Sequence, residues 1–325
     1  MQQIKVTPLA AESLGVRSMC AYVETPSIRI ILDPGVSICP SRFGLPPHPR
    51  EFRAIIDARK RIAESAEKAD VVTISHYHFD HHTPSFEDWL CNWTDAETAE
   101  RIYEDKLVLV KDYSQNVNAS QRRRGWVFEK TGGKHVKKIE PADSREILFG
   151  KTRVKFSRPV FHGLPNTPLG WVIMTTIDHE GERILFAPDV QGPLDNSTLQ
   201  AILDEKPQTA VIGGPPLYLA EHRIDEEQLM KGLRNLETLA TKIPLVIIEH
   251  HLLRDARWRV WAKQALESAL KKGNRMVTAA EFAGKEDNLL EAWRRQMYEK
   301  EPPSCEFEKW SKLPQFKQQK TRPPI

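Results

Sequence analysis

A histidine-rich stretch of eight residues, SHYHFDHH from Ser75 to His82, restricts the possible folds and functions of this chain more than any other segment. It directly follows an apolar run, Val71 to Ile74, that is typical of a buried β-strand. Imidazoles and a carboxylate at the end of a buried strand add little to a hydrophobic core, but they are good metal ligands. The sequence therefore predicts a metal site at the end of this strand.

The spacing within the stretch indicates two metal positions. In an extended segment, residues two apart point the same way, so His76 and His78 can bind one ion. A bend after them would turn Asp80 and His81 toward a second ion. Imidazole and carboxylate ligands suit zinc, manganese or iron. A histidine-rich surface loop is the alternative, but the position directly after an apolar strand favours metal binding.

Three further predicted strands also end in residues that can bind a metal. They are the strand at 154–160 with His162, the strand at 183–187 with Asp189, and the strand at 244–248 with His250 and His251. Taken singly, each of these residues has an ordinary explanation as a cap or a turn. Their recurrence at the same end of four strands favours one shared site.

Two turn signals accompany these strands. Asp33 ends a predicted strand at 28–32 and precedes Pro34-Gly35, and a turn is the simpler explanation of its position. Thr83-Pro84 resembles a helix start with Thr83 as the N-cap. We therefore expect His82, just before it, at the surface or at the entry to a helix.

The composition is that of an ordinary globular protein. The 325 residues are 40% hydrophobic and 28% charged, enough for one large domain or two small ones. A formal charge of +3 permits an anionic substrate without requiring one. The four cysteines form no C-x-x-C pair, which argues against a disulfide framework or a zinc ribbon. Without a signal peptide or a long apolar run, we expect a cytoplasmic protein that does not enter membranes.

Hydrophobic patterns predict a mixed α/β protein. Strands are expected at 4–7, 18–24, 28–32, 70–74, 106–111, 154–160, 170–177, 183–187, 209–212 and 244–248. Helices are expected at 51–69, 197–204, 225–243 and 257–272. The last forty residues lose periodicity, so we expect a mobile or loosely docked tail there.

The order of these motifs resembles that of the metallo-β-lactamase superfamily over roughly residues 4 to 280. The matching positions are Asp33, the stretch His76 to His81, His162, Asp189 and a late histidine. Within the superfamily, the chain most resembles an uncharacterised archaeal group of predicted metal-dependent hydrolases. That group shares the runs HHLLRD, here His250 to Asp255, and HGLPNTPLG, here His162 to Gly170.

The resemblance implies a four-layer αββα sandwich with two divalent metal ions, zinc first and manganese or iron as alternatives. It assigns His76, His78 and His162 to the first metal, Asp80, His81 and a late histidine to the second, and Asp189 as the bridge. For the late ligand we favour His251, with His250 beside it. Asp33 would support the site by hydrogen bonding. Asp80 would also be catalytic, because it would orient the attacking water.

The expected domain organisation is one domain at 1–285 with a basic insertion at about 86–150. Residues 286–325 form a C-terminal extension that is basic and proline-rich at its end.

The resemblance implies a metallohydrolase that uses a water activated by two metals, and the sequence leaves its substrate open. Phosphodiesters or phosphorylated compounds fit best, and lactones or thioesters are alternatives. A large capped nuclease is disfavoured, since only about sixty residues separate Asp189 from His250. A di-iron oxidoreductase is also disfavoured, because no glycine-rich cofactor loop is evident.

The basic segment 111–138 supports a different alternative, a non-catalytic nucleic-acid-binding protein on a hydrolase fold. It combines Arg122, Arg123 and Arg124 with aromatic residues, a mixture that can follow a phosphate backbone and stack on bases. A solvated basic face would have the same composition. Arg254 could likewise bind a phosphate or pair with its neighbour Asp255. The expected partner is thus a small-molecule or nucleic-acid substrate, and the oligomeric state stays undecided.

Overall fold

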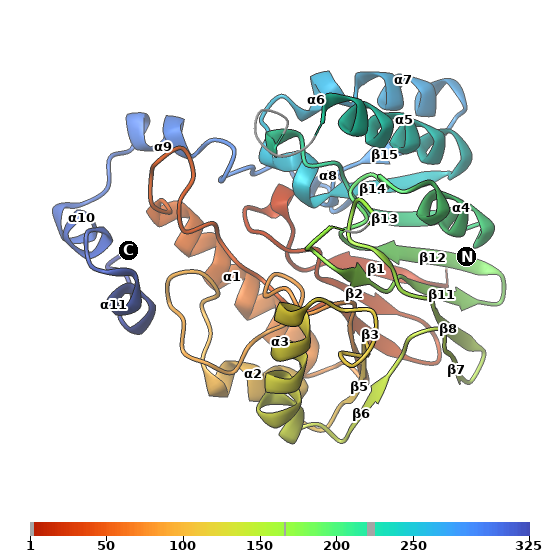
Figure 1. The fold of residues 1–325 in the computed structure, drawn as a ribbon, viewed down its shortest axis with the longest axis horizontal. Coiled ribbons are helices and arrows are strands. Elements are labelled where there is room, and N and C mark those ends of the chain that lie inside the picture. The colour runs from red at the N-terminus through yellow and green to blue at the C-terminus, as the bar shows by residue number, and fades with distance from the viewer. Residues whose placement is uncertain (1–2, 166, 220–224) are drawn as a thin grey trace.

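Two β-sheets pack face to face, with helices on the outer side of each (Figure 1). The computed structural model describes residues 3–165, 167–219 and 225–325. The first sheet is formed, in spatial order, by β1 (Lys5–Pro8), β2 (Ala21–Glu24), β3 (Arg29–Leu32), β4 (Val71–Ile74), β5 (Leu107–Val110) and β6 (Lys138–Pro141). The strands from β3 to β6 run parallel to their neighbours.

The second sheet has seven strands and is also mixed. In spatial order they are β15 (Arg275–Val277), β14 (Leu245–Glu249), β13 (Thr209–Gly213), β12 (Glu182–Ala187), β11 (Thr175–His179), β8 (Thr152–Phe156) and β7 (Glu146–Phe149). The strands from β12 to β15 are parallel. A separate two-stranded ribbon pairs β9 (Val160–Phe161) with β10 (Trp171–Val172).

Alternating side chains along the strands create three hydrophobic cores and so separate the four layers. In β3, Ile30 faces the second sheet, while its neighbour Ile31 faces the helices of the first layer. In β12, Phe186 faces the first sheet and Leu185 faces the helices of the fourth layer. The αββα sandwich expected from the sequence is confirmed.

Helices cover both outer faces of the sandwich (Figure 1). The first sheet is covered by α1 (Pro49–Ala66), α2 (Ala96–Tyr103) and α3 (Ala119–Lys130). The second is covered by α4 (Asn196–Asp204), α5 (Glu226–Lys242), α6 (Trp258–Trp261) and α7 (Lys263–Lys271), with α8 (Ala279–Phe282) near β14. No helix in the described part of the chain is long and apolar enough to cross a membrane.

The predicted helix start at Thr83-Pro84 is wrong. The next helix is α2, which begins at Ala96 with Asp95 as its N-cap. Thr83 is fully buried, and its hydroxyl donates to the carbonyl of Pro34 at 2.6 Å. The Thr83 hydroxyl also accepts a bond from Arg59, so its bonds are made to distant parts of the chain and not to a helix.

The C-terminal residues are docked on the first layer through buried side chains, so the expected tail is not mobile but packed. They form α9 (Arg294–Lys300), α10 (Cys305–Ser311) and α11 (Gln315–Lys320). Phe307 and Trp310 are buried against Phe52 of α1, at ring-centroid distances of 5.9 and 5.5 Å. Helices of about two turns are too short to show a clear period in the sequence, so the aromatic contacts could not be inferred from it.

The segment at about 86–150 is part of the sandwich. It supplies β5 and β6 to the first sheet, β7 to the second, and α2 and α3 to the outer layer. The polar stretch from Ser114 to Trp126 includes most of α3, capped at its start by Asn118.

Candidate metal centre

The candidate ligands lie where strands of both sheets end. Asp33 follows β3 and the histidine-rich stretch follows β4, its parallel neighbour. Asp189 and His250 follow β12 and β14 of the second sheet, and His162 follows β9. Because the strand ends of the two sheets meet at one edge, residues far apart in the sequence are brought together.

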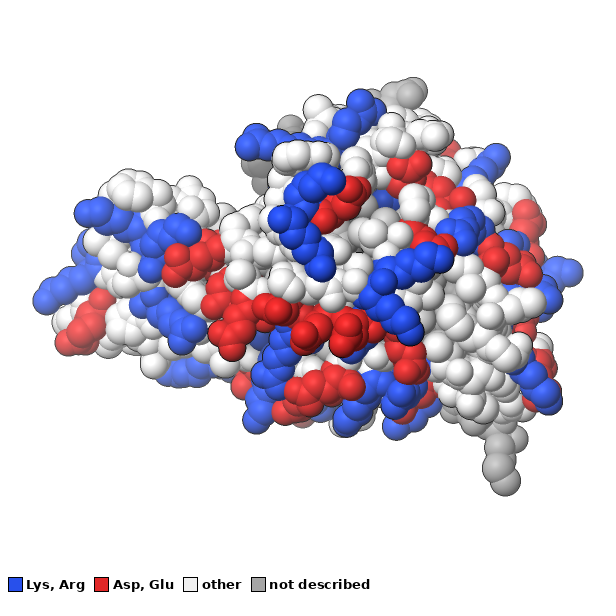
Figure 2. All heavy atoms as spheres, turned by 90° about the horizontal axis from the view of Figure 1, so that it is seen from below, with Lys and Arg blue, Asp and Glu red and all other residues white. Residues whose placement is uncertain are grey.

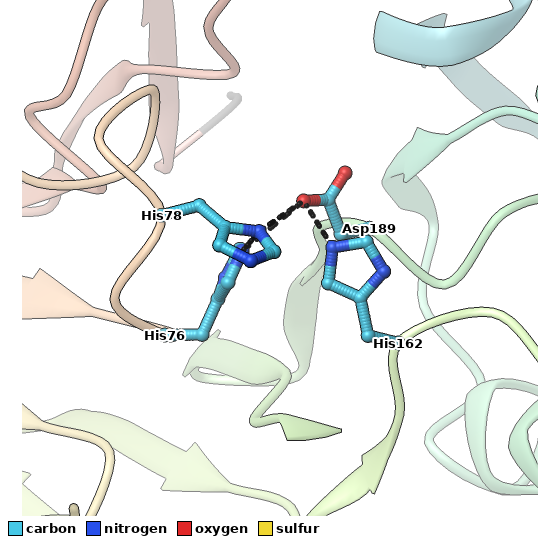
Figure 3. A group of neighbouring side chains, drawn as sticks. All are labelled: His76, His78, His162 and Asp189. Carbon is cyan, nitrogen blue, oxygen red and sulfur yellow. Dashed lines mark hydrogen bonds and ion pairs between the residues drawn. The ribbon is translucent and has the colours of Figure 1, made fainter. Parts of the chain in front are cut away.

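One group of potential ligands consists of His76, His78, His162 and Asp189, whose ligand atoms lie within 4.8 Å of one another. Figure 3 shows the imidazoles turned toward one carboxylate oxygen of Asp189. Oδ2 of Asp189 lies 3.1 Å from Nε2 of His76 and 2.9 Å from Nε2 of His162. Nδ1 of His78 lies 3.9 Å from the same oxygen.

A second group consists of Asp80, His81 and His250. Nε2 of His250 lies 3.4 Å from Oδ2 of Asp80 and 3.1 Å from Oδ1 of Asp189. Nε2 of His81 lies 3.2 Å from Oδ2 of Asp189. Asp189 therefore contacts both groups. Its Oδ1 faces both late histidines, His250 and His251, and its Oδ2 faces the histidines that come earlier in the chain.

The two late histidines differ in their surroundings. His251 also approaches Asp189, with its Nε2 at 3.1 Å from Oδ1, but it is not grouped with Asp80 and His81. Its Nδ1 accepts a hydrogen bond from the guanidinium of Arg254 at 3.0 Å, and arginine can only donate. Burial and the Arg254 cation lower the pKa of His251 well below its usual value, so the ring is neutral. The proton of this neutral ring must then sit on Nε2, which faces the site.

His250 is also contacted by Arg254, but its Nε2 is placed differently. Its Nδ1 lies 3.3 Å from a guanidinium nitrogen of Arg254 and 3.5 Å from Glu12, while its Nε2 faces the carboxylates of Asp80 and Asp189. Burial, with a contribution from Arg254, lowers the pKa of His250 to about 4. The ring is then neutral, and its Nε2 is the atom that faces Asp80 and Asp189.

Three residues at this edge have left-handed backbone conformations. The φ angles are +46° at Asp33, +52° at Asp189 and +68° at His250. Such conformations cost free energy in non-glycine residues and concentrate at functional sites. His250 thus has the backbone strain typical of a functional position, whereas His251 does not have a positive φ.

Asp33 holds the histidine-rich stretch by hydrogen bonds. Its Oδ1 accepts from the backbone N–H of Ser75 at 2.7 Å, and its Oδ2 accepts from the hydroxyl of Ser75 and from Nδ1 of His81. The bond to His81 leaves Nε2 of that ring free to face the site. Asp33 is fully buried and lies within reach of His76 as well.

Gly35 lets this stretch lie directly against the turn after β3. A Cβ atom at Gly35 would lie 2.3 Å from the backbone nitrogens of both His81 and His82. Only glycine permits such a close approach of two backbone segments.

The cluster suits divalent cations, because several of its buried polar atoms have no hydrogen-bond partner. Four buried ligand-type atoms lack a hydrogen-bond partner of good geometry: Nε2 of His81, Nε2 of His162, Nε2 of His251 and Oδ1 of Asp189. Leaving such groups unsatisfied costs about 1–3 kcal/mol each. All of them converge on the same small volume, where a cation would compensate them.

The charges of the cluster interact strongly. Burial alone would raise the pKa of Asp189, but the imidazoles of His162, His250 and His81 lower it well below its usual value. Burial opposes the charged form of His81, yet Asp189 and Asp33 raise the pKa of this ring well above its usual value. The site is thus a dense set of coupled anionic and imidazole groups, as expected for metal binding.

Among the candidate ligands, His78 and Asp80 are the most exposed to solvent. His76, His81 and His250 are fully buried, whereas the side chains of His78 and Asp80 are 25% and 18% exposed. These two residues therefore offer a substrate a route to the cluster.

The expected surface position of His82 is wrong. His82 is buried, its Nδ1 lies 3.0 Å from the carbonyl of His78, and burial lowers its pKa to about 3. A neutral ring at this position donates to the His78 carbonyl and stabilises the bend that separates the two ligand groups.

Arg254 is buried and already bonded. It pairs with Glu12 at 2.5 Å and donates to Tyr218 and His251, and no ion pair to Asp255 is formed. This arrangement argues against direct phosphate binding by Arg254. It shows instead that Arg254 fixes the orientation of the late histidines.

The three consecutive arginines of α3 point in different directions. Arg122 donates to the carbonyl of Ser114, while Arg124 donates to the carbonyl of Tyr77, between two candidate ligands. Arg123 and Arg124 line a cavity beside the site.

Sequence inspection missed Glu12, Tyr218 and Gly35. Glu12 lies in a short 3₁₀ turn, and no motif connects it to Arg254, 242 residues later. The Pro34-Gly35 pair indicated a turn. It did not indicate that the backbone of the histidine-rich stretch would pack against Gly35. Asn166, within the predicted run from His162 to Gly170, lies outside the described residues.

Comparison with known proteins agrees with the fold and identifies the family. No protein-family model matches the chain. The structure of unliganded yeast PDE1 aligns with 86% of this chain and 98% of its own chain, with a TM-score of 0.52 and 13% sequence identity. At so low an identity, this similarity concerns the fold alone. Tm1679, described as a metal-dependent hydrolase of the β-lactamase superfamily, has a TM-score of 0.44 at 12% identity, covering 85% and 95%.

Sequence relatives are much more similar than these structures. A UPF0282 protein of Methanopyrus kandleri is 42% identical over 294 residues, covering 90% of this chain and 99% of the relative. A UPF0282 protein of Pyrobaculum islandicum is 43% identical over 297 residues, covering 91% and 95%. The chain has a four-layer αββα fold and belongs to the UPF0282 family of archaeal proteins.

Proposed function

We propose that this protein is a hydrolase that depends on two divalent cations and acts on phosphodiesters or other phosphorylated compounds. The observation that carries the proposal is the convergence of two ligand groups on the buried Asp189 carboxylate. Zinc suits these ligands best, and manganese or iron would also fit. When bound, the cations would supply Lewis-acid activation of water and of the electrophilic centre.

The ligand roles follow from the arrangement of atoms. We assign His76, His78 and His162 to one cation and Asp80, His81 and His250 to the other, with Asp189 between them. We favour His250 over His251 as the late ligand, because it groups with Asp80 and His81 and its Nε2 faces Asp80.

Asp80 has the position required to handle the attacking water. Its side chain is partly exposed on the open side of the cluster, and the neighbouring His81, His250 and Arg254 lower its pKa despite burial, so it remains ionised. Its Oδ2 faces His250. Its other oxygen orients a water molecule and accepts the proton that this water loses.

His251 serves the substrate and not the cation. Its Nε2 proton points into the site and can donate a hydrogen bond to a substrate oxygen that gains negative charge. Arg254 and Tyr218, both bonded to its Nδ1, keep the ring in this tautomer.

Lactone or thioester hydrolysis would use the same cluster, so it stays as the second candidate. A purely nucleic-acid-binding role is less well supported, because three of the five lysines of the basic segment form ion pairs. Lys111 pairs with Asp143, Lys130 with Glu129 and Lys138 with Glu140.

A substrate panel tests the proposal. The full chain, loaded with zinc, manganese or iron, is assayed on bis(p-nitrophenyl) phosphate, p-nitrophenyl phosphate, a thioester and a lactone. Hydrolysis of the phosphate compounds that is lost in His78→Ala and Asp80→Ala is expected. The control His135→Ala alters an exposed histidine paired with Glu100. Equal rates for all four proteins would overturn the proposal.

A further inference from the structure

Two cavities meet beside the open side of the metal cluster. One, of about 410 Å³, is lined by His78 and Asp80, and the other, of about 430 Å³, lies against α3. Three residues line both cavities: Phe79, Phe86 and Arg124. Each volume falls within the range of small-molecule sites. A ligand at the cluster could therefore extend into the cavity at α3.

Arg124 lies between the two cavities, within the electrostatic influence of Asp80 but not in an ion pair with it. Its guanidinium stacks over the ring of Phe79, 4.2 Å from the centroid, and makes one bond, to the Tyr77 carbonyl at 3.3 Å. Within residues 3–165, 167–219 and 225–325, no carboxylate forms an ion pair with it or with Arg123. An arginine that is partly buried and held by stacking is well placed to bind an anion through its remaining donors.

The lining of the cavity at α3 combines cations with apolar surface. Its eleven lining residues include no Asp or Glu. The apolar part comes from aromatic and aliphatic side chains, and Phe86, 42% exposed, offers an uncovered ring. The polar part comes from Arg123, Arg124 and hydroxyl groups.

We propose that these joined cavities are the substrate site for a small organic phosphate that carries an aromatic or apolar group. The phosphate lies between the cluster and Arg124, and the apolar group lies in the cavity at α3. This inference rests on the proposed function and adds a substrate class to it.

A small ligand fits these observations better than a nucleic-acid strand. The face of the molecule shown in Figure 2 has acidic residues interspersed with the basic ones and no continuous basic band. Along the basic segment, Arg122 is turned to the carbonyl of Ser114, away from the cavity lined by Arg123 and Arg124. A strand that follows its backbone charge requires a track of unpaired cations, and the cavities supply only two.

Calorimetric titration with phenylphosphonate, which the enzyme cannot hydrolyse, tests the proposal on the metal-loaded full chain. Arg124→Gln should weaken binding about tenfold or more, because it removes a charge-assisted hydrogen bond. The matched control Arg122→Gln, two residues earlier on α3, should stay within about twofold. Methylphosphonate, which lacks the ring, should bind more weakly than phenylphosphonate, and Phe86→Ala should reduce that preference.

A second variant separates anion binding from support of the ligand loop, since Arg124 also bonds to Tyr77. Ser120→Asp places a carboxylate in the cavity, four residues before Arg124 on α3, and keeps the guanidinium that bonds to Tyr77. It should weaken phenylphosphonate binding with unchanged metal content. Equal binding by wild type, Arg124→Gln and Ser120→Asp would overturn the inference, as would tighter binding of a single-stranded oligonucleotide than of phenylphosphonate. Because binding and turnover are measured separately, binding without hydrolysis would count against the proposed function alone.

Discussion

Nδ1 of His81 donates a hydrogen bond to Oδ2 of Asp33 at 2.8 Å, across 48 residues of sequence. Asp33 also accepts two bonds from Ser75, at the start of the histidine-rich stretch. A single buried carboxylate therefore fixes where the stretch begins and how one of its ligands is oriented.

Replacing this carboxylate by an amide tests that role. In Asp33→Asn the amide can no longer accept all of these bonds, so His81 loses the partner that fixes its tautomer. We expect metal affinity to fall about tenfold to hundredfold, measured against a competing chelator. Asp105→Asn, at an exposed position with a positive φ, is the control. Unchanged affinity in Asp33→Asn would show that Asp33 does not orient the ligand.

The two late histidines should behave differently when truncated. His250→Ala removes a proposed ligand, so we expect the second cation to bind at least about tenfold more weakly in a calorimetric titration. His251→Ala should retain both cations but hydrolyse more slowly, by roughly tenfold to hundredfold, because a donor to the substrate is lost. The reverse result, loss of a cation only in His251→Ala, would exchange the two assignments.

Gly35→Ala should disturb the metal centre without touching a ligand. The new methyl group would meet backbone nitrogens at 2.3 Å, and backbone cannot yield as a flexible side chain can. We expect a loss of about 1–3 kcal/mol in the free energy of unfolding, together with reduced metal content. Gly133→Ala, whose Cβ would lie 3.1 Å from its nearest neighbour, should cost less and leave metal content intact.

The docked C-terminal segment should contribute measurably to stability. Arg294 of α9 is fully buried and forms two hydrogen bonds with Glu51 of α1, at 2.8 and 2.7 Å. Arg294→Leu leaves Glu51 as an unpaired buried charge, so we expect a loss of about 3–5 kcal/mol in chemical denaturation. The neighbouring, exposed Arg295 provides the control Arg295→Leu. Equal stability of the two variants would mean that this segment is not held by the ion pair.

The sequence predicted the fold and the cluster because both depend on local patterns. Apolar runs that end in ligand-type residues indicate strands, so Asp189 and His162 could be connected with the histidine-rich stretch, although His162 follows β9 of the separate antiparallel ribbon. The choice between His250 and His251 could not be made in this way, since it depends on the backbone conformation at His250 and on its approach to Asp80, which is distant in sequence.

Other features were beyond the sequence for a related reason. The burial of His82 results from packing against the Tyr77 and Phe128 rings, and the docking of Trp310 results from its contact with Phe52. Such contacts join segments whose own patterns are too short or too polar to indicate burial.

Elemental analysis of the purified full chain tests the central claim most directly. With Asp189 between two ligand groups, we expect two divalent cations per chain after dialysis against the metal and removal of excess. His78→Ala and Asp80→Ala, each in a different group, should each retain one, and the double variant none. A single cation in the wild type, lost completely in either variant, would contradict a two-metal centre.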